Sequence, residues 1–389
     1  MTSRRLSTSQ LVELDSIKKD AHFFLTLFAK LHNRESSGVL FPSLVPYYSL
    51  FTIESHKHLQ KICPQYALSL SNRFQAIIQA SRMRTKYFDD TRKRVDGTFE
   101  LLDWIADFHH KWHIGGHRGC LAPIRRAIQD DLGVFFYQGH VIGSTHTGIL
   151  NLGYSRGDLL TTSESISSSI GTLSFSIGKD LGEYIGKVIS FPEFAPDSTD
   201  LKDIDDSLQD EMLGYIDVKS NKYLTSIFNG HASEAINLSL MLFLTQVNFL
   251  QYVLNDLVVG TSCTLFKLKY IVLYHLASSL RKLQNYCYRE QTLTDHSLGH
   301  LQAIVTDRGL GEIASQSAFR NILVHYGIRD IPEELLSYDT KLYGLVEHFF
   351  DGRTYDEIAD IVDKQIERTS AILEEWFNWP VSQSRIRNW

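Results

Sequence analysis

Cysteine is scarce in this chain of 389 residues, and its spacing gives no sign of a disulfide framework. The four cysteines, Cys63, Cys120, Cys263 and Cys287, are widely separated and form no Cys-x-x-Cys pair. Scattered cysteines of this kind are typical of reduced thiols in the cytosol. The sequence therefore predicts a cytoplasmic protein that is stabilised by an apolar core rather than by covalent bridges.

Long apolar runs are also missing. A helix that crosses a bilayer needs about 20 nearly unbroken apolar residues, and residues 1–7 contain no apolar core of signal-peptide length. The most apolar stretch, residues 235–259, is interrupted by Asn237, Gln246, Asn248, Gln251, Asn255 and Asp256. We therefore expect this stretch to be a buried helix, and we expect no membrane partner.

An excess of positive charge is absent as well. The chain has 39 Lys and Arg against 45 Asp and Glu, a net charge of −6, so any contact with nucleic acid has to come from a local patch. It has no internal repeat, no Walker A loop, no dinucleotide-binding glycine fingerprint after a strand and no nucleophile elbow. These absences exclude the commonest nucleotide-binding and hydrolase signatures.

Helical periodicity dominates what is present, and 43% of the residues are hydrophobic. We predict a mainly α fold in three parts. Residues 1–130 are expected to form a helical domain, residues 131–210 an irregular α+β middle with a linker from 190 to 210, and residues 211–389 a helical bundle.

Periodicity and turn residues also predict the individual elements. The expected helices span 8–32, 46–62, 67–93, 99–112, 180–189, 235–259, 265–288, 334–350 and 355–379. The expected non-helical segments are a proline-punctuated turn at 40–46, short strands or apolar loops at 133–138, 140–143 and 147–154, loops at 161–169 and 295–300, and a frayed tail after Pro380.

The clearest basic run lies in the first part. Its positive residues, interleaved with two aromatic rings, are Arg82, Arg84, Lys86, Arg92, Lys93 and Arg94. Basic side chains alternating with rings can bind phosphates and stack bases. The alternative is a solvated helix face whose charge is partly neutralised by Asp89, Asp90 and Asp96. The run is a candidate surface for RNA or a nucleotide.

Histidine is concentrated just beyond this run. Residues 108–120 contain His109, His110, His113, His117 and Cys120. The i, i+4 spacing of His109 and His113 suits two imidazoles on one metal ion, and His117 and Cys120 can complete a zinc or iron site. Two alternatives remain open: a glycine turn that holds an anion beside Arg118, or a polar helix end whose histidines only form hydrogen bonds.

A third polar cluster lies within residues 318–330. The apolar side chains there recur at i, i+3, i+4 and i+7, as in one face of a helix, and they are Phe319, Ile322, Leu323 and Tyr326. Gly327 is expected to end this helix in the left-handed conformation. Arg320, Asn321 and His325 lie off the apolar face, so the last two turns carry a guanidinium, an amide and an imidazole.

At Arg320, Asn321 and His325 the chain resembles the HEPN family of helical-bundle domains. The family's mark is an arginine, usually followed by a polar residue, and then a histidine after four to six intervening positions. The resemblance covers roughly residues 261–380. It implies a HEPN-like bundle that cleaves RNA without a metal or other cofactor, in a toxin or phage-defence effector. It also implies a homodimer in which two motif helices share one cleft.

The residue types at this motif suit RNA cleavage. Histidine can transfer a proton, arginine offers phosphate oxygens a permanent charge and a forked donor, and asparagine can hold an oxygen. Because His325 lies in the last helical turn, the helix dipole favours a positive charge there by about 0.3–1 kcal/mol, which suits a general acid.

Other hypotheses remain open. Arg320 can instead pair with Asp330, and His325 can simply cap its own helix. The protein would then be a non-catalytic helical module that binds a nucleotide or a regulatory protein through residues 82–126, or a metalloenzyme that uses residues 109–120.

Overall fold

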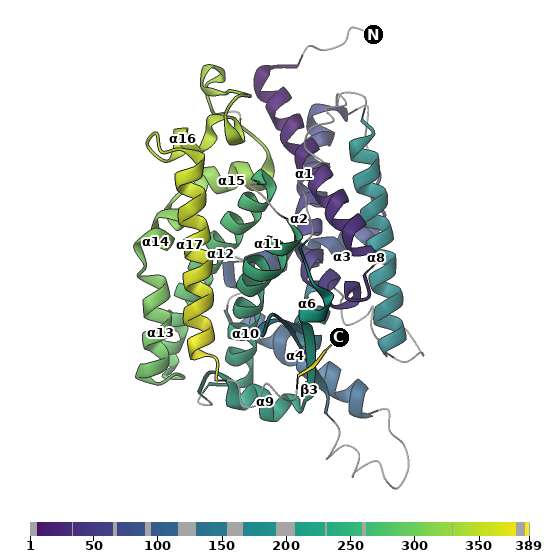
Figure 1. Ribbon diagram of the computed structural model, residues 1–389, viewed down its shortest axis with the longest axis vertical. Coiled ribbons are helices and arrows are strands. Elements are labelled where there is room, and N and C mark those ends of the chain that lie inside the picture. The colour runs from purple at the N-terminus through teal and green to yellow at the C-terminus, as the bar shows by residue number, and fades with distance from the viewer. Residues whose placement is uncertain are drawn as a thin grey trace.

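The computed structural model is mainly α-helical, as the sequence predicts, and a small sheet lies towards one end (Figure 1). The structure describes residues 6–378 and 386–388, apart from residues 33, 65–67, 90–94, 116–129, 154–165, 192–206, 230–231, 259–261 and 329. For residues 109–115, 166–170, 229 and 388 it describes the backbone only.

Of the N-terminal helices, α1, α2 and α3 lie on one side of the molecule together with α8, and α4 lies at the end that carries the sheet (Figure 1). Their bounds are α1 (Thr8–His32), α2 (Ser37–Ile62), α3 (Asn72–Arg82), the 3₁₀ helix η2 (Met83–Asp89), α4 (Val95–Gly115), α6 (Thr145–Asn151) and α8 (Ile166–Ile189). Ser71 caps α3 by accepting a hydrogen bond from the backbone N–H of Phe74, and Ser144 and Thr147 form a capping box at α6.

The C-terminal helices form the opposite side, and α10 and α12 run between the two groups (Figure 1). Their bounds are α9 (Ser220–Ser226), α10 (Glu234–Asn248), the π-helical turn η5 (Phe249–Val253), α11 (Leu254–Leu257), α12 (Cys263–Glu290), α13 (Asp295–Val305), α14 (Arg308–Ser315), α15 (Ser317–His325), α16 (Leu345–Phe349) and α17 (Tyr355–Trp376). Ser262 caps α12, and Thr354 forms a capping box with Glu357 at α17.

The sheet is antiparallel and has the order β2-β1-β3-β4. Its strands are β1 (Leu132–Tyr137), β2 (His140–Ser144), β3 (Leu213–Val218) and β4 (Arg387–Asn388). The first two confirm the strands predicted near residues 133 and 140. The tail prediction is wrong at Arg387 and Asn388, which pair with β3, because this edge strand offers unpaired backbone groups.

Several local predictions are wrong at positions where tertiary packing outweighs the tendency of proline or glycine to break a helix. The predicted turn at 40–46 is part of α2, which continues through Pro42 and Pro46 with Leu40 and Leu44 fully buried. The segment at 147–154 was predicted as a strand or apolar loop, but its residues 147–151 belong to the helix α6. The loop predicted at 295–300 is the start of α13 despite Gly299.

Two predicted helices are shorter or broken. The helix expected over 67–93 begins at Asn72, and it changes at Met83 into η2, where Tyr87 has φ 47°. The helix expected over 334–350 is divided into short turns, η6 (Glu333–Leu335), η7 (Lys341–Gly344) and α16. Residues 192–206 of the expected linker and residues 161–165 of the expected loop lie outside the described residues, whereas the loop prediction is wrong at 166–169, which form the start of α8.

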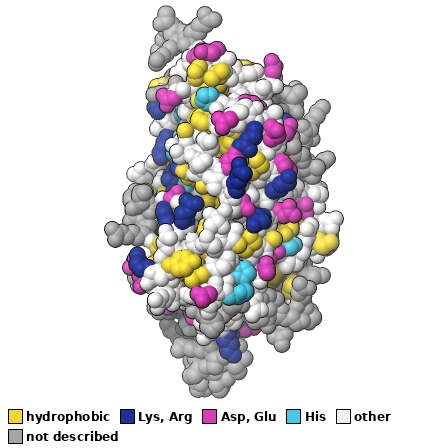
Figure 2. Space-filling model, turned by 90° about the vertical axis from the view of Figure 1, so that its left-hand side faces the viewer, with side chains coloured by type: hydrophobic (Ala, Val, Ile, Leu, Met, Phe, Trp, Pro, Cys, Tyr) yellow, Lys and Arg dark blue, Asp and Glu magenta, His cyan; other side chains and the backbone are white. Residues whose placement is uncertain are grey.

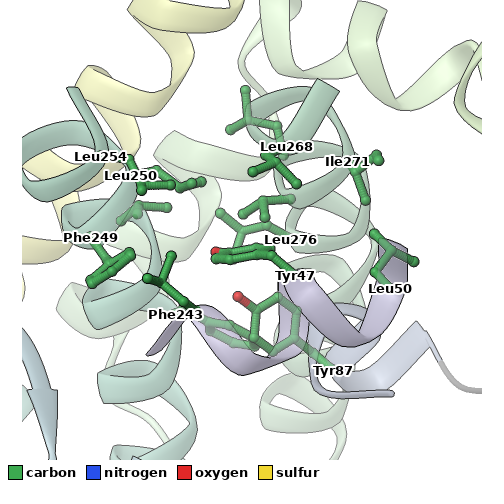
Figure 3. Close-up of a cluster of buried hydrophobic side chains, with 14 of the residues drawn as sticks. Tyr47, Leu50, Tyr87, Phe243, Phe249, Leu250, Leu254, Leu268, Ile271 and Leu276 are labelled. Carbon is green, nitrogen blue, oxygen red and sulfur yellow. The ribbon is translucent and has the colours of Figure 1, made fainter. Parts of the chain in front are cut away.

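One contiguous apolar core joins the early and late parts of the chain. In Figure 3, Tyr47 of α2 and Tyr87 of η2 lie beside Phe243 of α10 and Leu276 of α12. The rings of Tyr87 and Phe243 meet edge to face with centroids 4.8 Å apart. Full burial of each such side chain contributes about 1.5–3 kcal/mol relative to exposure. The predicted domain boundaries are not tested and stay predictions.

The segment Glu234–Leu257 is long and apolar enough to cross a membrane by length and composition alone, but 83% of its most apolar window is buried inside the protein. That burial is typical of the core helix of a soluble protein, and it agrees with the buried helix predicted over residues 235–259.

Candidate functional site

The candidate site is built on α15. Of the predicted apolar face, Phe319, Leu323 and Tyr326 are buried with at most 5% exposure and Ile322 is half-buried, and Val324, outside that prediction, is buried as well. The helix ends at His325, because Tyr326 rather than Gly327 adopts the left-handed conformation, with φ 62°. That conformation is strained for a tyrosine, so contacts of the following segment must hold it.

Three carboxylates from α1 and α2 hold the end of α15. The Tyr326 hydroxyl donates to Asp20 Oδ2 at 2.9 Å, and the backbone N–H of Ile328 donates to Glu13 Oε1 at 2.9 Å. His325 Nδ1 lies 2.5 Å from Glu54 Oε2. The position of the motif therefore depends on residues 271 to 315 positions earlier in the sequence.

Glu54 is the buried centre of this arrangement. Its side chain is 4% exposed, and its second oxygen, Oε1, pairs with Arg82 Nη2 at 2.5 Å and lies 3.7 Å from Lys57 Nζ. Burial alone would raise the pKa of Glu54, but the hydrogen bond with His325 and the charges of Arg82, His325 and Lys57 lower it. Glu54 is therefore a carboxylate, and His325 Nδ1 is the donor to it.

The other side of His325 is accessible. Its side chain is 46% exposed, and with Nδ1 held by Glu54 the second ring nitrogen, Nε2, is the one left for a substrate. A histidine whose ring is oriented by a buried carboxylate resembles the base and orienting group of many hydrolytic sites. The structure thus supplies an oriented imidazole rather than one that caps its own helix.

Arg320 lies over the ring of Tyr274 in α12, with 4.5 Å from the guanidinium carbon to the ring centroid. In the part of the chain that the structure describes, Arg320 forms no ion pair, with Asp330 or any other carboxylate. Burial and the positive charges of Arg82 and Arg320 lower the pKa of Lys86. The basic run and the C-terminal motif, predicted as separate sites, meet at Glu54, whose two oxygens bind Arg82 and His325.

A second carboxylate, Asp89 of η2, borders the site. It binds His275 Nδ1 at 2.9 Å, Ser278 Oγ at 2.9 Å and Lys282 Nζ at 2.7 Å. Burial opposes ionisation, but these three donors hold the pKa of Asp89 well below its ordinary value. Burial lowers the pKa of His275, more than the bond to Asp89 raises it. Asp89 is therefore ionised, and its oxygens already accept hydrogen bonds from these three neighbouring side chains.

Cations outnumber anions in this cluster. Around the end of α15 the positive side chains are Lys57, Arg82, Lys86, Lys267, Lys282 and Arg320, and the negative ones are Glu13, Asp20, Glu54 and Asp89, so six cations face four anions. Such an excess favours a bound anion, and phosphate oxygens fit arginine and lysine donors. On the face that carries α13, α14 and α17, by contrast, positive and negative side chains are interspersed (Figure 2).

The other predicted site residues are placed as follows. Asn321 is exposed on α15. Arg84 donates from Nε to the backbone oxygen of Leu150 at 3.2 Å, so it turns away from the motif. His109 and His113 lie in α4, but their side chains are not described. The remaining predicted residues, Arg92, Lys93, Arg94, Arg118, His117 and Cys120, lie outside the described residues.

Among the residues that the structure does describe, no group of three or more His, Cys, Asp or Glu side chains is arranged to hold a metal ion. This statement does not reach the histidine-rich turn at 109–120, where zinc or iron stays a prediction.

Sequence reasoning missed the residues that complete the site, namely Glu54, Lys57, Tyr274, His275 and Asp89. The local sequence of α2 carried only a weak signal, because Glu54 directly follows the largely apolar stretch from Leu44 to Ile53 and is itself followed by polar residues. A lone carboxylate on the buried side of a helix requires a cationic partner. The identity of that partner was not readable from the sequence.

Comparison with known proteins gives no relative on which to base an assignment: no family model, curated protein or solved structure matches this chain.

Proposed function

We propose that the protein is a metal-independent endoribonuclease of HEPN type, a cytoplasmic toxin or phage-defence effector. The observation that carries the proposal is the accessible His325 imidazole, held at 2.5 Å by buried Glu54 in a cluster that also contains Arg320 and Lys86. No metal is required for this chemistry, since all of its proton-transfer and charge-stabilising groups are side chains.

Each group has a part in cleavage by the ribose 2′-hydroxyl. His325 Nε2 exchanges a proton with the reacting hydroxyl or the leaving 5′-oxygen. Arg320 and Lys86 stabilise the negative charge that develops on the phosphorane oxygens. Glu54 fixes the orientation of the imidazole through Nδ1. The products are a 2′,3′-cyclic phosphate and a 5′-hydroxyl.

A second copy of the chain supplies what one motif lacks. Cleavage requires one group that removes a proton and another that donates one, whereas α15 has a single histidine. In the proposed homodimer the exposed faces of two α15 helices, including Asn321, meet across one RNA-binding cleft. His325 of one protomer then acts as the base and its counterpart as the acid.

The first test is cleavage of total RNA and tRNA in EDTA by wild-type protein and by the His325→Ala and Arg320→Ala variants. Loss of a proton-transfer group typically lowers the rate by about 10²–10⁴-fold, so we expect at least that loss for His325→Ala. His348→Ala is the matched control, because His348 is exposed on α16, packed on Phe349. Wild-type products should carry cyclic phosphate ends.

The same assay separates the alternatives. Equal cleavage by wild type, His325→Ala and His348→Ala would contradict the assignment of the motif as the catalytic site. Tight RNA binding without cleavage would instead favour a non-catalytic nucleotide- or RNA-binding module, which the excess of cations also supports. Purified protein that retains zinc or iron, and loses it in a His113→Ala/His117→Ala variant, would favour a metalloenzyme.

A further inference from the structure

A large apolar cavity lies away from the proposed catalytic cluster. It has a volume of about 920 Å³ and is bounded by α1, α2, α6, α8 and the β1–β2 hairpin. Its apolar lining includes Phe28, Phe41, Phe135, Ile149, Leu152 and Phe175. Figure 1 shows α8 beside α1 at the side of the molecule where the cavity lies. Ligand sites typically occupy about 300–1,000 Å³, so this volume accommodates a sizeable ligand.

Glycines on two helices keep this space open. A Cβ atom added to Gly178 would lie 3.4 Å from Phe41, one added to Gly182 3.8 Å from Phe28, and one added to Gly148 3.7 Å from Pro42. Around Gly171 nothing lies within 4 Å. Alanine would therefore fit at each position and would stabilise the helix relative to glycine. Gly186 outside the cavity also has open space around it, so these glycines leave the cavity unfilled but are not specific to it.

The ionisable side chains in the lining indicate what the ligand carries. They are His32 and Lys179, both exposed, so they lie at the mouth rather than at the base. No Asp or Glu is among the described lining residues. Glu183, one turn beyond Lys179 on α8, is paired with Lys187 at 2.6 Å, and the hydrogen bond and charge of Lys187, together with the charge of Lys179, lower the pKa of Glu183. The mouth thus favours a negative group, and hydroxyls of Ser37 and Ser174 line the same cavity.

An apolar interior with a cationic mouth fits an amphiphile whose head is an anion. We propose that this cavity binds a free fatty acid, with its alkyl chain among the phenylalanines and its carboxylate at Lys179. Burial of the chain supplies most of the affinity, because each buried methylene group contributes separately. Phe175 is 71% exposed, so part of the apolar lining faces solvent until a ligand covers it. The proposal is independent of RNA cleavage.

The test is titration of the full-length protein with the fluorescent fatty acid cis-parinaric acid, followed by displacement with hexadecanoate. We expect saturable binding and competition by hexadecanoate. Gly182→Leu fills the cavity and should weaken binding by at least about tenfold, equivalent to about 1.4 kcal/mol. Gly186→Leu is the matched control: it lies one turn further along α8, with open space around its Cβ, and should bind as wild type does.

A second pair of variants tests the contact with the carboxylate head group. Both substitutions are at exposed lysines, so neither alters the apolar core. Lys179→Met should weaken hexadecanoate binding about three- to tenfold and leave binding of hexadecanol unchanged. Lys222→Met, at an exposed lysine of α9 outside the cavity, should change neither. Absence of saturable binding by wild type, or equal affinity in Gly182→Leu and Gly186→Leu, would overturn the proposal. So would binding to phosphatidylglycerol vesicles without binding of the free acid, since that result assigns the face to a membrane.

Discussion

At the scale of single residues, Glu54 has two roles that the structure does not separate. One carboxylate oxygen holds the His325 imidazole, and the other neutralises Arg82, which is itself only 5% exposed. Removing one member of a buried ion pair is strongly destabilising because its partner is left without a counter-charge. Any variant at Glu54 therefore has to be measured for stability as well as for activity.

We expect Glu54→Gln to lower the free energy of unfolding by about 3 kcal/mol, since Arg82 then remains buried without its carboxylate. Arg82→Met should be destabilising for the complementary reason. The double variant should lose clearly less than the sum of the two single losses, by about 1 kcal/mol or more. Urea denaturation of the four proteins measures this coupling, and additive losses would contradict the pairing.

The pH dependence of stability has the same origin. Because the pKa of Glu54 is lower in the folded protein than its ordinary value of 4.5, the folded state binds fewer protons there than the unfolded state does. This contribution to stability is fully present above about pH 4.5 and is lost as the pH falls through the lowered pKa. Repeating the urea series on both sides of that window should show the Glu54→Gln loss shrinking in acid.

At the scale of elements, the end of α15 is fixed by α1 rather than by its own sequence. Asp20 accepts from the Tyr326 hydroxyl, from Thr264 Oγ1 at 2.7 Å and from Lys267 Nζ at 3.1 Å. This buried network, together with the packing of the Tyr326 ring, stabilises the left-handed conformation at Tyr326. Because His325 immediately precedes Tyr326, the network also sets where the imidazole lies.

We expect Tyr326→Phe to cost about 1.5 kcal/mol of folding free energy, because a hydrogen bond to a charged acceptor is lost while Lys267 and Thr264 still satisfy Asp20. Tyr338→Phe removes the hydroxyl of a 54% exposed tyrosine and should change stability by less than about 0.5 kcal/mol. Thermal and urea unfolding of the two variants make the comparison. A loss of the same size in both would show that the bond to Asp20 contributes nothing.

Helices with a long apolar period were predictable from the sequence, as α1, α12 and α17 illustrate. Local signals failed where distant contacts decide the conformation. Pro42 and Pro46 lie inside α2 because its buried face is continuous. Gly327 was the obvious helix terminator by propensity, yet Tyr326 takes the left-handed conformation because Asp20 holds its hydroxyl. No pattern within ten residues of Tyr326 contains that information.

At the scale of the whole molecule, the candidate site was likewise only partly predictable from the sequence. Arg320, His325 and the basic residues were identifiable by residue type and spacing. Their convergence was not, since Glu54 and Arg82 come from α2 and α3, whereas Arg320 and His325 come from α15. Periodicity reports which face of a helix is buried, but not which helix covers it. The prediction of separate functional surfaces followed from that limit.

The arrangement of the core bears on whether the C-terminal part can exist alone. Helix α10 packs against α4 and β2 from the earlier part of the chain and against α17 from the later part, and α12 packs along η2. The strand β3, within residues 211–389, pairs with β1 outside that range. Cutting the chain at residue 211 would expose these buried faces and leave an unpaired strand edge.

We therefore expect a fragment of residues 211–389 to lack a cooperative unfolding transition, whereas the full chain unfolds in one transition seen equally by near- and far-ultraviolet circular dichroism. Side chains such as Phe243 and Leu276, buried partly by Tyr47 and Tyr87 (Figure 3), lose their cover in the fragment. A fragment that melted cooperatively, with sharp near-ultraviolet signals, would show an autonomous bundle and restore the predicted domain boundary. The fragment would also lack Glu54, so a cooperative fragment that still cleaved RNA would remove that carboxylate from the mechanism.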